Sequence, residues 1–95
     1  MPRPVGIPNR RQTGTLQQAL GACVTALRIK QGISQAALAA KLGYSISYIS
    51  KLERGEMNPT LRTLFDLADS LEIEPDRLVR AIKHSFEKRK SRQRG

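Results

Sequence analysis

Residues 45–54 read SISYISKLER and carry small polar and basic side chains at helical spacing. On a helical wheel, Ile49 and Leu52 mark the side that is buried. The polar side chains fall roughly opposite them: Ser47, Ser50, Lys51 and Arg54. A lysine ammonium can donate to guanine O6 or N7, a serine hydroxyl can bond to any base, and an isoleucine can touch a thymine methyl. The chemistry that this stretch offers is therefore contact with the edges of DNA bases.

Two short helices are expected to position these side chains. The first covers residues 35–42, with Ser34 as its N-cap, and ends at Gly43, because the tight turn there needs the left-handed backbone conformation. Ser45 caps the second helix, which runs to about Arg54. Two helices joined by a short turn that contains glycine form the unit that places its second helix in the major groove of DNA.

Three further helices are predicted around this unit. Thr15 and Gln18 form a capping box at the start of the first, Thr60 caps another, and Pro75 opens the last. Apolar residues recur at helical spacing along all three, namely Leu20, Val24 and Leu27, then Leu61, Leu64, Leu67, Ala68 and Leu71, then Leu78, Val79, Ile82 and Phe86. The predicted fold class is all-α: a compact bundle of five short helices, without strands, that contains a helix-turn-helix.

Composition divides the chain into three parts. Residues 1–14 contain three prolines and no periodic apolar pattern, so we expect a flexible basic N-terminal arm. Residues 15–86 hold the helical pattern and are expected to form the folded domain. Residues 87–95, EKRKSRQRG, are charged and lack core positions, which predicts a basic, disordered C-terminal tail.

The formal net charge of +9 is distributed unevenly within the domain. Residues 15–54 hold five basic residues against one acidic residue, whereas residues 55–82 hold three arginines against six acidic residues. A domain with one basic half and one acidic half can present one face to a polyanion. This distribution favours double-stranded DNA as the partner.

Several other functions are not supported by the residues. A single cysteine, Cys23, excludes an intrachain disulfide and a cysteine zinc cluster, and the lone His84 has no neighbours at metal-ligand spacing. Paired carboxylates in an apolar setting and a phosphate-binding glycine loop are both missing, so we expect neither an enzyme nor a cofactor nor a small-molecule ligand. Without a membrane-spanning run or a signal peptide, the expected location is the cytoplasm, with the nucleoid when DNA is bound.

Three motifs carry a resemblance to a known family. They are GISQ-x-x-LA at residues 32–39, YIS-x-LERG at residues 48–55 and NPTL-x-TL-x-x-LA at residues 58–68. From Leu20 to about Ile82 the chain resembles the lambda-repressor-like, Cro/repressor-type helix-turn-helix family, also called the XRE family. The resemblance implies a bundle of four or five helices that binds operator DNA, usually as a two-fold dimer.

The resemblance also implies roles for single residues. Contacts to base edges fall on Ile46, Ser47 and Lys51, with Ser45 and Ser50 as additional contacts. Contacts to DNA phosphates fall on Gln35, Tyr48, Arg54, Asn58, Thr60, Arg62 and Arg28. Arg28 and Glu53 correspond to a structural ion pair that fixes the tilt of the second helix of the unit. Leu78, Ile82 and Phe86 lie in the region that the family uses for dimerisation.

These observations predict a sequence-specific transcriptional regulator, most simply a repressor that binds a palindromic operator as a homodimer. One alternative is an antitoxin-type DNA-binding module of a toxin–antitoxin pair, in which the basic tails would bind an acidic protein partner. Another is a controller protein of a restriction system, since such proteins share this size and fold.

Overall fold

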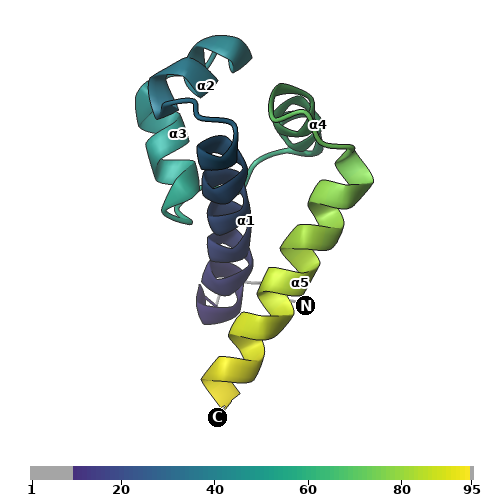
Figure 1. Ribbon diagram of the computed structural model, residues 1–95. Helices are drawn as coiled ribbons and strands as arrows, with labels where there is room; N and C mark the ends of the chain where they lie inside the picture. Colours follow the sequence, from purple (N-terminus) through teal and green to yellow (C-terminus); the bar gives the residue numbers. More distant parts are fainter. Residues whose placement is uncertain (1–9, 95) are drawn as a thin grey trace.

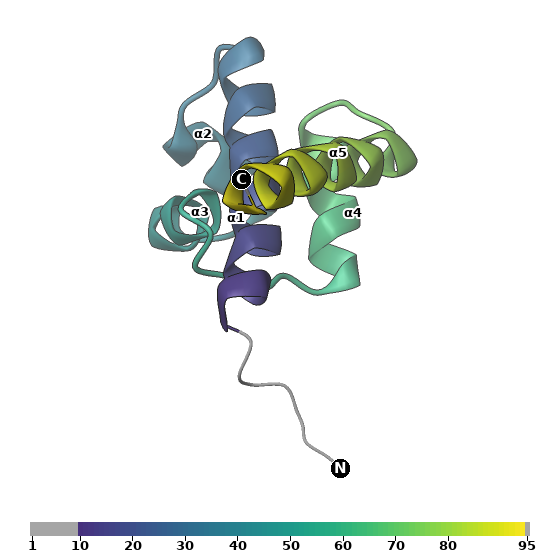
Figure 2. The same ribbon diagram turned by 90° about the horizontal axis from the view of Figure 1, so that it is seen from below.

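The computed structural model describes residues 10–94, and in this range the chain forms five helices and no strand. They are α1 (Arg10–Lys30), α2 (Gln35–Leu42), α3 (Ile46–Glu53), α4 (Leu61–Ser70) and α5 (Pro75–Arg94). Helix α1 lies in the middle, with α2 and α3 on one side of it and α4 on the other, while α5 crosses it (Figures 1 and 2). The predicted all-α class is confirmed.

Three of the predicted N-caps are present. The side-chain oxygens of Ser34, Ser45 and Thr60 each accept a hydrogen bond from the backbone N–H three residues further on, at 3.0, 3.0 and 3.2 Å. Gly43 ends α2 in the left-handed conformation, with φ of 77°. Because a β-carbon is disfavoured in this conformation, glycine sets the short turn between α2 and α3.

A single core joins all five helices. Its buried side chains are Ala19, Leu20, Val24, Leu38, Ala39, Ile49, Leu52, Leu67, Ala68, Leu71 and Leu78. Full burial of each large aliphatic side chain contributes about 1.5–3 kcal/mol. Two residues that were predicted to share the buried stripes are instead on the surface: Leu61 is 70% exposed and Val79 is 48% exposed. Leu61 is the first residue of α4, and Val79 is rotated by one position from the buried Leu78.

Two predicted helix ends differ from the structure. Helix α1 begins at Arg10, so Thr15 lies inside the helix and does not cap it. Helix α5 continues to Arg94 through the segment that was expected to be disordered. Most residues of this segment are strong helix formers, and pairs one turn apart support it, such as Lys83 with Glu87 at 3.9 Å. The division into arm, domain and tail stays a prediction, and residues 1–9 and 95 lie outside the described range.

None of the helices within residues 10–94 is long and apolar enough to cross a membrane.

Candidate nucleic-acid interface

Helix α3 has one buried side and one open side. Ile49 and Leu52 are fully buried, whereas Ser47 and Lys51 are exposed and Ile46 is 53% exposed. A large aliphatic side chain that is half exposed at the first turn of a helix contributes little to the core and is free to contact another molecule. The residues predicted to contact base edges therefore lie together on the open side of α3.

The two additional serines already make contacts within the protein. The Ser45 hydroxyl accepts from the Tyr48 backbone N–H, which leaves its own proton and one lone pair for other partners. The Ser50 hydroxyl, which is half-buried, accepts from Nη1 of Arg54 at 2.6 Å. The N-cap role of Ser45 was predicted from the sequence, whereas the contact of Ser50 with Arg54 was not.

A nearly buried ion pair holds α3 against α1. Arg28 donates to Glu53 through Nε at 2.6 Å and through Nη2 at 3.0 Å, and their side chains are only 14% and 6% exposed. Burial raises the pKa of Glu53, but hydrogen bonds from Arg28 and Gln35 outweigh burial, and the pKa lies below its ordinary value. For Arg28, the same hydrogen bond raises the pKa above its ordinary value. Both groups are therefore charged at neutral pH.

Gln35 connects α2 to the same ion pair. It is the first residue of α2, and its side-chain Nε2 donates to Oε1 of Glu53 at 2.9 Å. An amide group has two N–H donors, so one remains for a DNA phosphate. Arg28 is placed less well for that role, because it also donates to the Ile33 carbonyl at 2.9 Å and is mostly buried. Its geometry fits the structural role, and its phosphate contact stays a prediction.

A polar contact that the sequence did not predict joins the turn before α3 to α4. The Tyr44 hydroxyl lies 3.0 Å from Oγ1 of Thr63, which is buried and lies 3.1 Å from Oγ1 of Thr60. The ring of Tyr44 packs edge-on against Tyr48, with centroids 5.0 Å apart. Burial raises the pKa of Tyr48, and the neighbouring Tyr44 raises it further. The Tyr48 phenol therefore keeps its proton at neutral pH.

The segment after α3 adds exposed polar groups beside this surface. Arg54, Asn58, Thr60 and Arg62 are all exposed, and Thr60 caps the N-terminus of α4. The first backbone N–H groups of a helix have no partner inside the helix and attract anions. Arg54 pairs with Glu56 at 2.9 Å, and Arg62 lies 3.9 Å from Asp66. Four of the residues predicted to contact phosphates are therefore accessible in the segment that runs from the end of α3 into α4.

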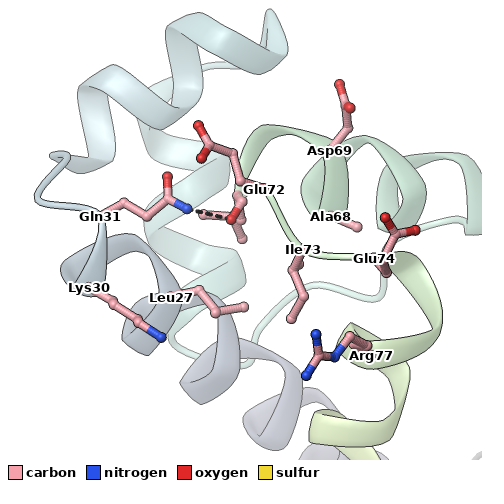
Figure 3. Close-up of a pocket in the computed structure, with 10 residues that line it drawn as sticks. Leu27, Lys30, Gln31, Ala68, Asp69, Glu72, Ile73, Glu74 and Arg77 are labelled. Carbon is pink, nitrogen blue, oxygen red and sulfur yellow. Dashed lines mark hydrogen bonds between the residues drawn. The ribbon is translucent and has the colours of Figure 1, made fainter.

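A hollow elsewhere on the molecule has a different character. It lies between the end of α1 and the turn from α4 to α5, where Gln31 donates to the Leu71 carbonyl at 2.6 Å (Figure 3). Three acidic residues line it, Asp69, Glu72 and Glu74, together with Lys30 and Arg77. It contains none of the residues predicted to contact DNA. With three acidic residues against two basic ones, the lining carries no net positive charge to attract a polyanion, so we do not place DNA there.

The structure changes the set of residues that a second copy could contact. Leu78 is fully buried, so it belongs to the core and cannot form a dimer surface as predicted. Ile82 and Phe86 are half-buried and stay candidates. Leu61 and Phe65 of α4, one helical turn apart, are 70% and 50% exposed. The sequence analysis placed Leu61 in the core because it fits the apolar spacing, and it assigned no role to Phe65.

Comparison with known proteins identifies the class. The model of the helix-turn-helix family matches residues 24–78, more than half of the chain, and the chain belongs to this family. Over 64 residues it is 38% identical to y4dJ of Sinorhizobium fredii, an uncharacterized HTH-type transcriptional regulator, covering 67% of this chain and 83% of that protein. A second regulator from that organism, y4dL, is 41% identical over 63 residues, but the match spans only 32% of its length.

Solved structures show the same fold. The restriction-modification controller protein C.AhdI from Aeromonas hydrophila is 37% identical, with a TM-score of 0.63 over 65% of this chain and 94% of that chain. The clp gene regulator ClgR from Corynebacterium glutamicum shares the fold at 23% identity, with a TM-score of 0.77 over 97% of this chain and 87% of that chain. The protein is a DNA-binding transcriptional regulator of the XRE-type helix-turn-helix family, and its relatives form a class that is not enzymatic.

Proposed function

We propose that this protein is a sequence-specific repressor that binds a palindromic operator as a homodimer and inserts α3 into the major groove. The observation that carries the proposal is the two-sided character of α3. Its inner side is fully buried, while Ser47 and Lys51 are exposed on its outer side. The Arg28–Glu53 pair fixes the tilt of the helix at the same time. A rigid helix with exposed donors is what reading of base edges requires.

Base contacts are assigned to Ile46, Ser47 and Lys51, with Lys51 as the main determinant. Its ammonium can donate to guanine O6 or N7, while the serine hydroxyl is less selective. These reading positions hold no arginine, asparagine or glutamine, which are the residues that make bidentate contacts to bases. Part of the specificity would then come from the shape of the DNA and from bridging water molecules.

Phosphate contacts are assigned to residues in α3 and in the segments before and after it: Gln35, Tyr48, Arg54, Asn58, Thr60 and Arg62. Gln35 and Thr60 lie at the N-termini of α2 and α4, where free backbone N–H groups add to side-chain donors. Contacts of this kind fix the orientation of the protein on the duplex without selecting a sequence.

Dimerisation is supported by apolar surface on the two last helices. Leu61 and Phe65 on α4 and Val79 on α5 are each about half exposed or more, and Ile82 and Phe86 are half-buried. An apolar surface marks a protein contact where such residues form one contiguous patch. A two-fold dimer would read two half-sites about one helical turn of DNA apart. Such a regulator would act in the cytoplasm, on the nucleoid.

A second candidate is a controller protein of a restriction system, and the 37% identity to C.AhdI favours it. A controller protein differs from a simple repressor in its target, which would be a promoter of restriction–modification genes. The antitoxin-type alternative stays a prediction. Co-purification of a small acidic protein with the full chain would support it.

Selection of bound sequences from a random pool of DNA duplexes tests the proposed function. We expect enrichment of a palindromic sequence with half-sites about one helical turn apart. Enrichment of a single, non-palindromic site would contradict the dimer, and no enrichment at all would contradict sequence-specific binding. Placement of the selected operator over a promoter, with a reporter gene, then separates repression from activation.

A further inference from the structure

Arg54 immediately follows α3, and its side chain is held on two sides by neighbouring residues. Nε and Nη2 donate to the two carboxylate oxygens of Glu56 at 2.9 and 3.2 Å. Nη1 donates to the Ser50 hydroxyl at 2.6 Å. The Arg54 side chain is nevertheless 53% exposed. It is therefore both fixed and accessible.

These contacts leave a defined part of the guanidinium free. A guanidinium has five N–H donors in one plane, and three of them are used here. Glu56 takes the edge formed by Nε and Nη2, and Ser50 takes one proton of Nη1. The two remaining protons, one on Nη1 and one on Nη2, are free to donate to another acceptor. Guanidinium N–H groups form strong, charge-assisted hydrogen bonds to phosphate oxygens.

The backbone turn after α3 is what brings Glu56 to this position. Gly55 adopts φ of 80°, its N–H donates to the Leu52 carbonyl at 3.1 Å, and the N–H of Glu56 donates to the Lys51 carbonyl at 2.9 Å. These two bonds define a Schellman motif, which fixes the residue after the glycine relative to the last helical turn. The Glu56 side chain therefore starts from a fixed backbone.

We propose that Glu56 is a positioning residue for DNA binding, which holds the Arg54 guanidinium so that its two free N–H groups meet a DNA phosphate. This inference rests on the proposed function. Freezing an arginine side chain costs conformational entropy, and a protein that has already fixed it loses less on binding DNA. Ser50 assists from the other side.

The proposal makes a prediction opposite to that of simple electrostatics. Glu56 carries a negative charge beside a surface that binds a polyanion, so charge alone predicts that its removal strengthens binding. If the carboxylate positions Arg54, its removal weakens binding, because the arginine then has to be ordered by the DNA. The sign of the change in affinity therefore distinguishes the two roles.

The experiment compares four full-length proteins: the wild type, Glu56→Ala, Arg54→Ala and the double variant. Fluorescence anisotropy with a labelled duplex that the random-pool selection enriched gives dissociation constants at several salt concentrations. We expect Arg54→Ala to bind about 10-fold more weakly, as loss of one charge-assisted contact implies, and to lower the slope of the salt dependence by about one. Glu56→Ala should bind about 3-fold to 10-fold more weakly. In a protein that already carries Arg54→Ala, the Glu56→Ala substitution should cause no further loss of DNA affinity.

Glu87→Ala is the matched control, because it removes one exposed carboxylate from α5 and changes the net charge equally. It should bind at least as tightly as the wild type. Tighter or unchanged binding by Glu56→Ala would overturn the proposal, and so would an equal loss in both Arg54 backgrounds, which would indicate an effect through the fold. Failure of the wild type to bind any duplex would instead contradict the proposed function itself.

Discussion

Gly21 in the middle of α1 lies directly against the backbone of Glu53 at the end of α3. A β-carbon at position 21 would lie 2.7 Å from the Leu52 carbonyl oxygen and would also collide with the Glu53 carbonyl. Both neighbours are backbone atoms, which cannot move aside as a flexible side chain can. The absence of a side chain at Gly21 thus sets how closely α3 approaches α1.

The first prediction concerns this contact. Gly21→Ala should lower the free energy of unfolding by about 2 kcal/mol, because overpacking outweighs the better helix propensity of alanine. It should also weaken DNA binding, because α3 is pushed from its position. Denaturant unfolding and anisotropy measure the two effects.

Gly32→Ala is the control, since nothing lies within 4 Å of a β-carbon there and only the backbone φ of 70° is disfavoured. It should cost stability by about 1 kcal/mol and leave the DNA affinity of the folded protein unchanged. A Gly21→Ala protein that is more stable than the wild type would contradict the close approach.

The second prediction concerns the dependence of stability on pH. The pKa of Glu53 is lower in the folded protein than its ordinary value of 4.5. A lowered pKa means that ionised Glu53 stabilises the fold above pH 4.5, and that this contribution is lost as the pH falls through the folded-state pKa. Urea unfolding should therefore give a free energy that decreases as the pH is lowered from 4.5.

Glu53→Gln should remove most of this pH dependence and cost about 3 kcal/mol at pH 7, because it leaves Arg28 largely buried without its partner. Glu56→Gln is a suitable control, because Glu56 is exposed and its pair adds little stability. An unchanged pH dependence in Glu53→Gln would show that other carboxylates cause the acid sensitivity.

The third prediction is a stabilising substitution. Glu72 follows the end of α4 with φ of 57°, and the N–H groups of Glu72 and Ile73 close the turn by bonding to the carbonyls of Asp69 and Ala68. The equivalent positions after α1, α2 and α3 are all glycine. Glu72→Gly should raise the free energy of unfolding by about 0.5–1 kcal/mol, because glycine tolerates this conformation.

Thermal unfolding followed by circular dichroism is the measurement for Glu72. Glu74→Gly, two residues later, is the comparison. Glu74 does not have a positive φ, so this substitution should lower the free energy of unfolding. If both substitutions destabilise the protein equally, the backbone strain at Glu72 has no energetic consequence.

The fourth prediction separates phosphate contacts from base contacts. Arg62 is exposed on α4 and only 3.9 Å from Asp66, an arrangement that contributes little stability. Arg62→Ala should weaken binding to all duplexes alike and lower the salt slope by about one, because one released counterion is lost. Anisotropy titrations with specific and random DNA at several salt concentrations check this. A loss confined to the specific duplex would place Arg62 among the base-reading residues.

The local signals in the sequence were sufficient for the central unit. Ser34, Ser45 and Thr60 cap the helices that they were predicted to cap, since an N-cap depends on a side chain and a backbone group only three residues apart. Gly43 ends α2 for an equally local reason. The Arg28–Glu53 pair spans 25 residues, and it was predicted only because the chain resembles a family that has such a pair.

Other features depend on contacts that a linear pattern does not contain. The continuation of α5 past Phe86 follows from helix propensity and pairs one turn apart, in a segment without core positions. The Tyr44–Thr63 hydrogen bond and the Gly21 contact join elements that are distant in the sequence. Leu61 fits the apolar period of α4 but lies at its first residue, outside the core.

The central claim is that α3 reads the DNA sequence, and Lys51 tests it most directly. The measurement is the ratio of dissociation constants for random and selected duplexes, compared between the wild type and Lys51→Ala. Lys30→Ala, which removes an exposed lysine at the end of α1, is the control for the change of charge.

If Lys51 reads a guanine, its loss should cost about 1–3 kcal/mol of discrimination, so the ratio should fall by about 5-fold to 150-fold. Lys30→Ala should retain the ratio of the wild type. Equal weakening of Lys51→Ala on selected and random DNA would contradict the claim.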